Sequence, residues 1–446
     1  MKIKKLALIT LAAITLINIA AFTGCNSGTE NNNSYNNDET GSEVPVVQVM
    51  VERHPLESLN YEVMKAPVNE AAFAFNLGQK LLAEQDADDN FVFSPLSVWL
   101  PLAALVNATD EANKPALLEA LGAGGMTEEQ LNEYTQNILY RITGELNKKY
   151  EPEFKSPLNI ANALFVSQDV TVKQSFAQSF ADNYLGTMFN VDFSSQQAVD
   201  EVNKWASEHT EGLITNVIDE FNPETVAAIT NAVYYSSGWA WEFKENETKP
   251  DVFYTANGET SAEYMKLERD GQTYYEDERI QAIALTFNSG GRLWILLPKN
   301  ETANELYISL TDSYFNEISL NQTSRTGTLM LPKFEIGNRL DLKDALIALG
   351  IPLFDREAAP LTGGLIESSA PVWLDEAIHK AMIMIDEKGT TASAVTVLEF
   401  PLGGEGRQPT SPFEMSCNKP FVFVLEDYRQ ILFTGVVNNP AAAPGS

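Results

Sequence analysis

The chain has 446 residues and a formal net charge of −31, with 61 acidic residues against 30 Lys and Arg. Hydrophobic residues make up 44% and charged residues 20%, a composition typical of a globular protein rather than a disordered one. Nucleic acid is excluded as a main partner, because phosphate binding needs clustered Lys and Arg. With only two cysteines, a disulfide framework and a cysteine-rich metal site are excluded as well.

The first residues have the pattern of an export signal: a basic start, an almost unbroken apolar stretch over residues 6–22, and small residues before Cys25. A Cys at this point resembles a bacterial lipoprotein signal, in which the Cys is lipidated, although a plain secretory signal and an uncleaved anchor are alternatives. We expect a signal peptide at 1–24, then a lipidated Cys25 and a disordered tether at 25–58. The protein would be a cell-surface or periplasmic lipoprotein, or secreted, and would touch a membrane only through its lipid.

The folded body is expected to begin at residue 59 with helices. Apolar residues recur at helical spacing after Asn69, which is a suitable N-cap. Ser94-Pro95 is a favourable helix start, because Pro is tolerated in the first turn. The predicted helices are 69–85, 98–106 with its start at Ser94-Pro95, 127–146, 174–185 and 196–209, and a strand is predicted at 158–166.

Strands dominate from residue 225 onward. Residues 225–235 are apolar and partly β-branched, as expected of a central strand covered on both faces. Helices early and strands late indicate an α+β fold, and the sequence shows no repeat or second linker that would divide it. The other predicted strands are 263–266, 274–275, 280–287, 292–297, 328–334, 377–385, 420–425 and 430–437, with a short helix at 340–349 that ends at Gly350.

No pattern of residues indicates an enzyme. The three histidines, His54, His209 and His379, are not spaced as metal ligands, and His379 lies in an apolar strand, where a core histidine is expected. Nothing resembles a nucleophile elbow, and Gly122–Gly125 lacks the Lys and the strand–helix context of a phosphate loop. We therefore expect neither catalysis nor a metal or cofactor.

Residues 386–403 combine a strand pattern with the position of a loop. Read with a period of two, one face is small or apolar and the other carries the charge. The first face consists of Thr390, Ala392, Ala394, Thr396, Leu398 and Phe400, and the second of Thr391, Ser393, Val395, Val397 and Glu399. The stretch runs directly into residues 403–412, which have the Gly, Pro and Ser of an exposed loop.

Several of these segments, in order from about residue 69 to 440, together resemble the serpin family. Any one match is weak, whereas the ordered series is specific. The matching segments are N-x-x-F-S-P-x-S at 90–97, I-A-N-x-L-F within 158–166, Asn203-Lys204-Trp205 with Thr210-Glu211-Gly212, Asn231–Tyr235 with Trp239 and Phe243, Leu331–Phe334, His379-Lys380, 386–390 and Asn418–Phe421.

The resemblance implies a fold of three β-sheets with eight to nine helices and an exposed reactive-centre loop, with a serpin domain at 59–440 and a short tail at 441–446. It implies a monomer without cofactors that inhibits serine, and possibly cysteine, proteases by suicide. The protease cleaves the loop and is trapped as an acyl-enzyme when the loop inserts into the central sheet. A non-inhibitory serpin acting as a binding or structural module is the alternative.

The resemblance also assigns the loop hinge. Inhibitory serpins have small residues after the hinge Gly so that this segment can enter the sheet. The hinge residues here are Glu387, Gly389, Thr390, Thr391, Ala392, Ser393, Ala394, Val395 and Thr396. Departures from the family pattern at 391, 393 and 395 all lie on one face, so the other face meets no bulky or charged obstacle if it is the one that faces the core.

Two further groups of residues are assigned by resemblance. Ser94, Ser97, Asn231 and His379 match a polar cluster beneath the point where the sheet opens, and Trp239 matches an aromatic residue above it; ordinary packing is the alternative for each. The usual spacing from the hinge Gly places the reactive bond at Gly403-Gly404. Leu402-Gly403 would suit an elastase- or chymotrypsin-like enzyme, and Arg407-Gln408 a trypsin-like one.

Overall fold

The computed structural model describes residues 47–54, 59–148, 156–210, 212, 215–390 and 412–444. Several predicted site residues therefore lie outside the described residues. They are the lipidation site Cys25, the hinge residues Thr391, Ala392, Ser393, Ala394, Val395 and Thr396, and the reactive-bond candidates Leu402, Gly403, Gly404, Arg407 and Gln408.

Most predicted helices are confirmed close to their expected bounds. Asn69 caps α1 by accepting a hydrogen bond from the backbone N–H of Ala72, and Thr127 forms a capping box with Gln130 at the start of α4. The helix expected at 127–146 ends early at Ile142, and Gly144, two residues beyond, has φ 72°. The helices are α1 (Glu70–Ala83), α2 (Pro95–Leu105), α3 (Lys114–Ala120), α4 (Glu128–Ile142), α5 (Glu145–Lys148), α6 (Gln174–Tyr184), α7 (Gln196–His209), α8 (Ala303–Ile308), α9 (Asp312–Leu320) and α10 (Lys343–Ala348).

The strands form two sheets within the part of the chain that the structure describes. In the six-stranded sheet the order is β1-β4-β3-β5-β12-β11, and its strands are β1 (Val47–Val49), β4 (Gly186–Val191), β3 (Leu158–Ser167), β5 (Ala227–Tyr235), β12 (Glu376–Ile385) and β11 (Phe334–Asp341). The nine-stranded sheet has the order β13-β10-β7-β8-β9-β14-β15-β2, with β6 paired to β7. Its strands are β13 (Phe413–Ser416), β10 (Thr323–Pro332), β7 (Gly258–Glu276), β8 (Ile280–Thr286), β9 (Arg292–Pro298), β14 (Phe421–Asp427), β15 (Gln430–Val437), β2 (Phe91–Phe93) and β6 (Lys249–Thr255).

The long strand β7 explains why two sheets are seen where three were expected. It pairs with β6 and β10 along most of its length and with β8 at its end, so hydrogen bonds run continuously from one expected sheet into the next. Only two short pieces of β7, 263–266 and 274–275, could be predicted from the sequence, because the acidic and basic residues between them hide the alternation.

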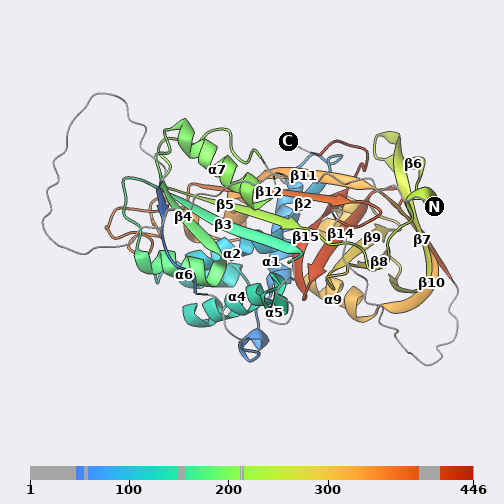
Figure 1. Ribbon diagram of the computed structural model, residues 1–446, viewed down its shortest axis with the longest axis horizontal. Helices are drawn as coiled ribbons and strands as arrows, with labels where there is room; N and C mark the ends of the chain where they lie inside the picture. The colour runs from blue at the N-terminus through green and yellow to red at the C-terminus, as the bar shows by residue number, and fades with distance from the viewer. Residues whose placement is uncertain are drawn as a thin grey trace, which may run out of the picture. The chain divides into compact units, whose positions relative to one another are not determined.

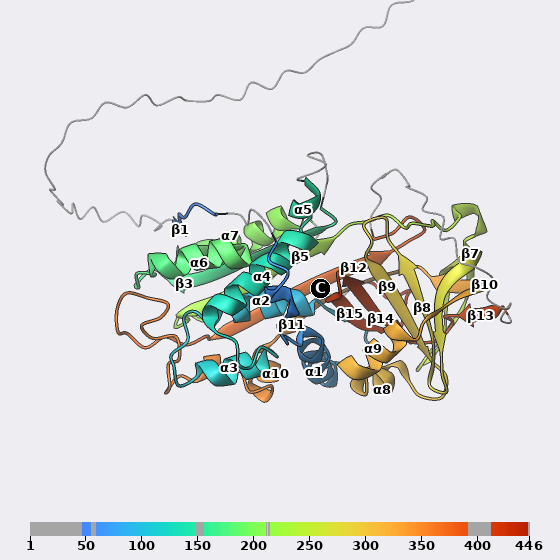
Figure 2. The same ribbon diagram turned by 90° about the horizontal axis from the view of Figure 1, so that it is seen from below.

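The six-stranded sheet is covered on both faces. Helix α7 lies across one face (Figure 1), and an apolar cluster that includes Phe165, Phe189, Val202, Trp205 and Ile378 fills the space between them. The main core, with α2 and the nine-stranded sheet, occupies the other side. Figure 2 shows α1, α3 and α10 gathered on the side away from α7. Loop insertion into this sheet would therefore have to occur between two packed layers.

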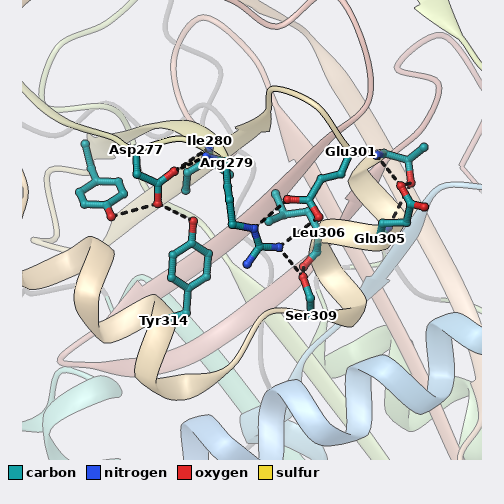
Figure 3. Close-up of polar contacts among 10 residues, drawn as sticks. Asp277, Arg279, Ile280, Glu301, Glu305, Leu306, Ser309 and Tyr314 are labelled. Carbon is teal, nitrogen blue, oxygen red and sulfur yellow. Dashed lines mark hydrogen bonds and ion pairs between the residues drawn. The ribbon is translucent and has the colours of Figure 1, made fainter.

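A polar network fixes α8 and α9 to the start of β8. The carboxylate of Asp277 accepts hydrogen bonds from the hydroxyl of Tyr314 at 2.8 Å and from the N–H of Ile280 at 2.8 Å (Figure 3). The guanidinium of Arg279 donates to Glu301 and, at 2.6 Å, to Ser309. These bonds connect the segment before β8 to the ends of α8 and to α9.

The tether prediction needs correction at its end. Residues 47–54 were assigned to a disordered segment, yet Val47–Val49 forms β1 and pairs antiparallel with β4. His54 then contacts Asp182 through its backbone N–H at 2.6 Å and its ring at 3.2 Å. The alternating apolar residues of this stretch complete the sheet edge. No helix among the described residues is long and apolar enough to cross a bilayer.

Candidate functional site

The site lies along the seam between the parallel strands β5 and β12. Their pairing covers only residues 228–231 and 376–379, ending at Asn231 and His379. Beyond that point β5 still pairs with β3 and β12 with β11, but the paired registers of β5 and β12 do not continue. Because both strands run in the same direction, an antiparallel segment could pair with both of them in the remaining part of the seam.

A buried polar cluster surrounds the point where the pairing ends. Nε2 of His379 accepts a hydrogen bond from the backbone N–H of Ser94 at 3.0 Å, and the hydroxyl of Ser97 donates to the carbonyl of Ser94 at 3.0 Å. Burial lowers the pKa of His379 to about 3, so the ring is neutral, with its proton on Nδ1. The structure thus brings three of the four predicted cluster residues into direct contact.

Asn231 belongs to the same cluster through its strand register, and it has a partner that the sequence analysis missed. Its Nδ2 donates to Oδ1 of Asn162 at 2.8 Å, and Nδ2 of Asn162 donates to the carbonyl of Tyr184 at 2.6 Å. Asn162 stands in the otherwise apolar segment 158–166, and a polar residue in such a strand could have indicated a buried hydrogen-bond partner. Within the described structure, Ser94 Oγ, Asn231 Oδ1 and His379 Nδ1 are buried atoms without a hydrogen-bond partner.

Trp239 connects the end of β5 to the segment after β12. Its backbone N–H donates to the carbonyl of Lys388 at 2.8 Å, and its indole N–H donates to the carbonyl of Asp386 at 2.9 Å. The ring is buried and stacks on Phe287 at 4.3 Å. Four residues later, the N–H of Phe243 donates to the carbonyl of Glu387 at 3.0 Å. The turn at 239–243 therefore holds the start of the predicted hinge at two points.

The first residues of the predicted hinge contact the chain that follows β5. Gly389 has φ 144°, and a Cβ there would lie 2.1 Å from the carbonyl oxygen of Ser237, so only glycine fits. Thr390 is buried; its N–H donates to the Ser237 carbonyl at 3.1 Å, and its Oγ1 accepts from the Ser237 N–H at 2.9 Å. The predicted hinge thus begins with one antiparallel bridge, between Gly389 and Gly238 of the chain that follows β5.

Glu387 forms the charged contact at this end of the seam. Its carboxylate accepts from Nζ of Lys333 at 2.8 Å and from the hydroxyl of Thr248 at 2.8 Å. Burial raises the pKa of Glu387, but the hydrogen bonds from Lys333 and Thr248 outweigh burial, so the pKa is below its ordinary value. Neither partner of Glu387 was predicted from the sequence, although Lys333 is the polar residue between β10 and β11.

These observations define what the site could do chemically. Beyond Asn231 and His379 the β5–β12 pairing stops, with the polar cluster at the paired end and the first residues of the predicted hinge at the other end. Across the described ranges, no three His, Cys, Asp or Glu side chains gather as a metal site would require.

Comparison with known proteins agrees with this geometry. The family model described as Serpin (serine protease inhibitor) matches residues 68–440. The chain is 27% identical over 384 residues to alpha-1-antiproteinase of Callosciurus caniceps, covering 84% of this chain and 89% of that protein. It is 27% identical over 387 residues to plasma serine protease inhibitor of Bos taurus, covering 85% and 92%.

Among solved structures, the native state of the thermophilic serpin tengpin matches with a TM-score of 0.74 at 24% identity, covering 89% of this chain and all of that one. This likeness confirms the α+β serpin fold that the sequence motifs predicted. Together with the family match over residues 68–440, it shows that the chain belongs to the serpin family.

Proposed function

We propose that this serpin is a suicide inhibitor of serine proteases, and of cysteine proteases with the same acyl-enzyme chemistry, rather than a turnover enzyme. Cleavage of the loop would allow residues after Gly389 to enter the seam as a new strand. The observation that carries the proposal is a pair of strand registers, one continued from β12 and one from the chain after β5. Both would place the inserted residues at the same positions between the two strands.

The first register comes from β12. The backbone N–H of Asp386 donates to the carbonyl of Gly389 at 3.0 Å, which pairs these two residues across a tight turn. Continued as an antiparallel hairpin, the register would place Thr390 beside Ile385 and Thr396 beside His379. The second register starts from the antiparallel bridge between Gly238 and Gly389, and it would place Thr396 beside Asn231.

The two registers agree, because Asn231 and His379 are themselves paired across the seam. A strand inserted between β5 and β12 could therefore pair with both of them without a shift in register. Thr396 would lie between the two buried atoms that lack partners, Asn231 Oδ1 and His379 Nδ1. Its hydroxyl could donate to the first and accept from the second.

The same register decides which face of the loop would enter the core. Odd-numbered residues of β12, from Ala377 to Ile385, are buried, whereas Lys380, Met382 and Met384 are partly exposed. Paired residues of antiparallel strands share a face, so even-numbered loop residues would face the core. These are the small or apolar residues from Thr390 to Phe400, and the departures at 391, 393 and 395 would face outward.

The register also bears on the reactive bond. The first residue of β12, Glu376, would pair with residue 399, so an inserted segment would reach the end of the strand there. Cleavage after Leu402 or Gly403 would leave a tether of only a few residues to the trapped protease. Cleavage after Arg407 would leave a longer tether. We therefore propose Gly403-Gly404 or Leu402-Gly403 first, and Arg407-Gln408 second.

Export and lipidation at Cys25 are part of the proposal, resting on the first 25 residues of the sequence. The protein would act as a monomer held outside the cytoplasm and would inhibit extracellular or periplasmic proteases. Labelling with a fatty-acid analogue tests this, because label should enter the wild type and be absent from Cys25→Ala.

The test of function mixes the purified protein with trypsin, chymotrypsin and elastase and analyses the products on denaturing gels. We expect a complex at the summed mass of serpin and protease, and mass spectrometry of the released peptide would identify the cleaved bond. We also expect loop nicking to raise the melting temperature. Simple degradation, with no rise in melting temperature after nicking, would favour a non-inhibitory binding module.

A further inference from the structure

An exposed tryptophan lies against an arginine near the hinge. The guanidinium carbon of Arg269, in β7, lies 3.6 Å from the ring centroid of Trp241, and 51% of the tryptophan surface is exposed. Large exposed tryptophans are uncommon on soluble proteins, and Trp and Arg are the residue types enriched at the energetic centres of interfaces. The stack pre-orders both side chains, which lowers the entropy lost when a partner covers them.

The position of the stack relative to the loop suggests which partner covers it. Trp241 is the central residue of the turn 239–243, whose ends hold the carbonyls of Lys388 and Glu387 just before the loop. Arg269 lies opposite Gly327 of β10, and Gly327 lies opposite Phe413, the first residue of β13 after the loop. At the usual strand spacing, Arg269 is about 10 Å from that second anchor. Figure 2 shows β7, β10 and β13 side by side at this end.

The second anchor, Phe413, is held by close packing on two neighbouring strands. Gly327 leaves space for the ring of Phe413, since a Cβ at Gly327 would lie 2.3 Å from that ring. Phe413 in turn stacks on Tyr274 of β7 with ring centroids 4.2 Å apart. The stack of Trp241 on Arg269 therefore lies between two fixed ends of the loop, where the body of a protease bound to the loop must approach.

The charges around the stack describe the partner's surface. Exposed charges of both signs lie beside the stack, and the acidic ones outnumber the basic ones. Glu242 and Glu245 lie on the turn 240–248, and Glu268 and Asp270 flank Arg269 in β7. The exposed basic residues are Lys244 on the same turn and Lys388, which pairs with Glu245 at 3.2 Å. An acidic surface around an aromatic anchor fits a partner with basic residues around an apolar depression.

We propose that Trp241, stacked on Arg269, is a secondary docking site for the target protease, and that this protease carries a basic surface beside its active-site cleft. The inference rests on the proposed inhibitory function and adds a contact outside the loop. Trp241 would be buried in the first non-covalent complex, before cleavage, so it would increase the rate of association and select among proteases that can cleave the same bond.

The test uses whichever of trypsin, chymotrypsin and elastase the full-length wild type traps fastest. Trp241→Ala is compared with Tyr61→Ala, a control that removes an aromatic ring with 64% of its surface exposed from the N-terminal region. Three quantities are measured: the second-order rate constant of trapping, the Kd for the same protease with its catalytic serine replaced by alanine, and the number of serpin molecules consumed per protease trapped.

We expect Trp241→Ala to slow trapping by about tenfold or more and to weaken the Kd by a similar factor, as for an interface anchor. Serpin consumption per trapped protease and the melting temperature should equal those of Tyr61→Ala. Glu242→Gln should slow trapping at low salt and have little effect at high salt, because salt screens exposed charges.

Equal trapping rates for the two alanine variants would overturn the docking site while the inhibitory function stands. Slower trapping with an unchanged Kd, or with a lower melting temperature, would show that the stack only stabilises the hinge, and would also overturn it. If the wild type traps none of the three proteases, the inhibitory function is contradicted first, and the docking site is rejected with it.

Discussion

Asn231 and His379 are paired neighbours at the last step of the β5–β12 seam, and each keeps one buried polar atom without a partner. A buried unpaired group costs about 1–3 kcal/mol, so two at one step of a sheet is an unusual arrangement for a static core. The arrangement is explained if the native fold is not the final one and a later strand supplies the missing partner.

Replacing Thr396 with valine tests this explanation. The hydroxyl would be lost at similar side-chain size, leaving both atoms unpaired in the inserted form. We expect the loop-cleaved variant to be less stable than cleaved wild type by about 1–3 kcal/mol, measured by guanidinium unfolding. Uncleaved protein should be unaffected, and Thr396→Ser should behave as wild type. A loss of stability in the uncleaved Thr396→Val protein would contradict the proposed register.

The ion pair between Glu387 and Lys333 should retard premature opening of the hinge. We expect Glu387→Gln to lose trapping activity about fivefold faster during incubation without protease, since a partly exposed ion pair is worth up to about 1 kcal/mol. Glu245→Gln is the matched control, because it removes the exposed pair between Glu245 and Lys388 beside the same turn.

This effect should depend on pH in a defined direction. The folded-state pKa of Glu387 is below its ordinary value of 4.5, so the stabilisation is complete above pH 4.5 and is lost as the pH falls through the folded-state value. Wild type and Glu387→Gln should therefore differ in the rate of activity loss at pH 7 and become alike in strongly acidic buffer. A constant difference at every pH would contradict an ionic origin.

The sequence predicted elements where local chemistry decides the structure. Helix α7 was predicted with its observed bounds, because its apolar residues share one face and Ser195 caps it. Helix α8 was missed, although its N-cap Thr302 and Glu305 form a capping box that could be recognised. Strand β11 was missed because its Asn338 and Arg339 look like loop residues, and their side chains instead bond to Asn90 and Val217.

The residues of the candidate site also divide into those that a local motif predicts and those that only the folded chain brings together. His379, Ser94 and Ser97 could be predicted because they match a motif in order. The sequence could not show that the β5–β12 pairing stops at Asn231, or that Lys333 reaches Glu387, because both depend on how separate segments meet in space. The sequence alone could not decide which face of the predicted hinge would point into the core. The alternation of buried and partly exposed residues in β12 favours the even-numbered face.

Strand β1 should protect the outer edge of β4. A protein that begins at residue 59 lacks β1, whereas one that begins at residue 44 keeps it. We expect the shorter protein to show faster hydrogen–deuterium exchange in the peptide covering Gly186–Val191, because one side of that strand loses its hydrogen-bond partner. It should also self-associate at high concentration, as measured by light scattering. Equal exchange in the two proteins would mean that β1 contributes nothing to this edge.

The buried His379 should make the native state sensitive to acid. Burial lowers its pKa to about 3, against an ordinary value of 6.5, so the unfolded state binds a proton that the folded state does not. Its contribution to the free energy of unfolding is therefore complete above pH 6.5 and declines as the pH falls towards 3. By pH 4.5 the loss should be about 3 kcal/mol.

The carboxyls of the partly buried Glu70 and the buried Asp427 act in the opposite direction, so the histidine effect must be measured as a difference in stability between wild type and a His379 variant. Burial raises the pKa of Glu70 and of Asp427 to about 7, which favours the folded state as the pH falls below 7. The urea midpoint of uncleaved wild type is therefore compared with that of His379→Gln at each pH from 7.5 to 4.5. The carboxyl contributions cancel in the difference, which should shrink on acidification as wild type loses the histidine contribution. A difference that stays constant over this range would mean that His379 accepts a proton in the folded state.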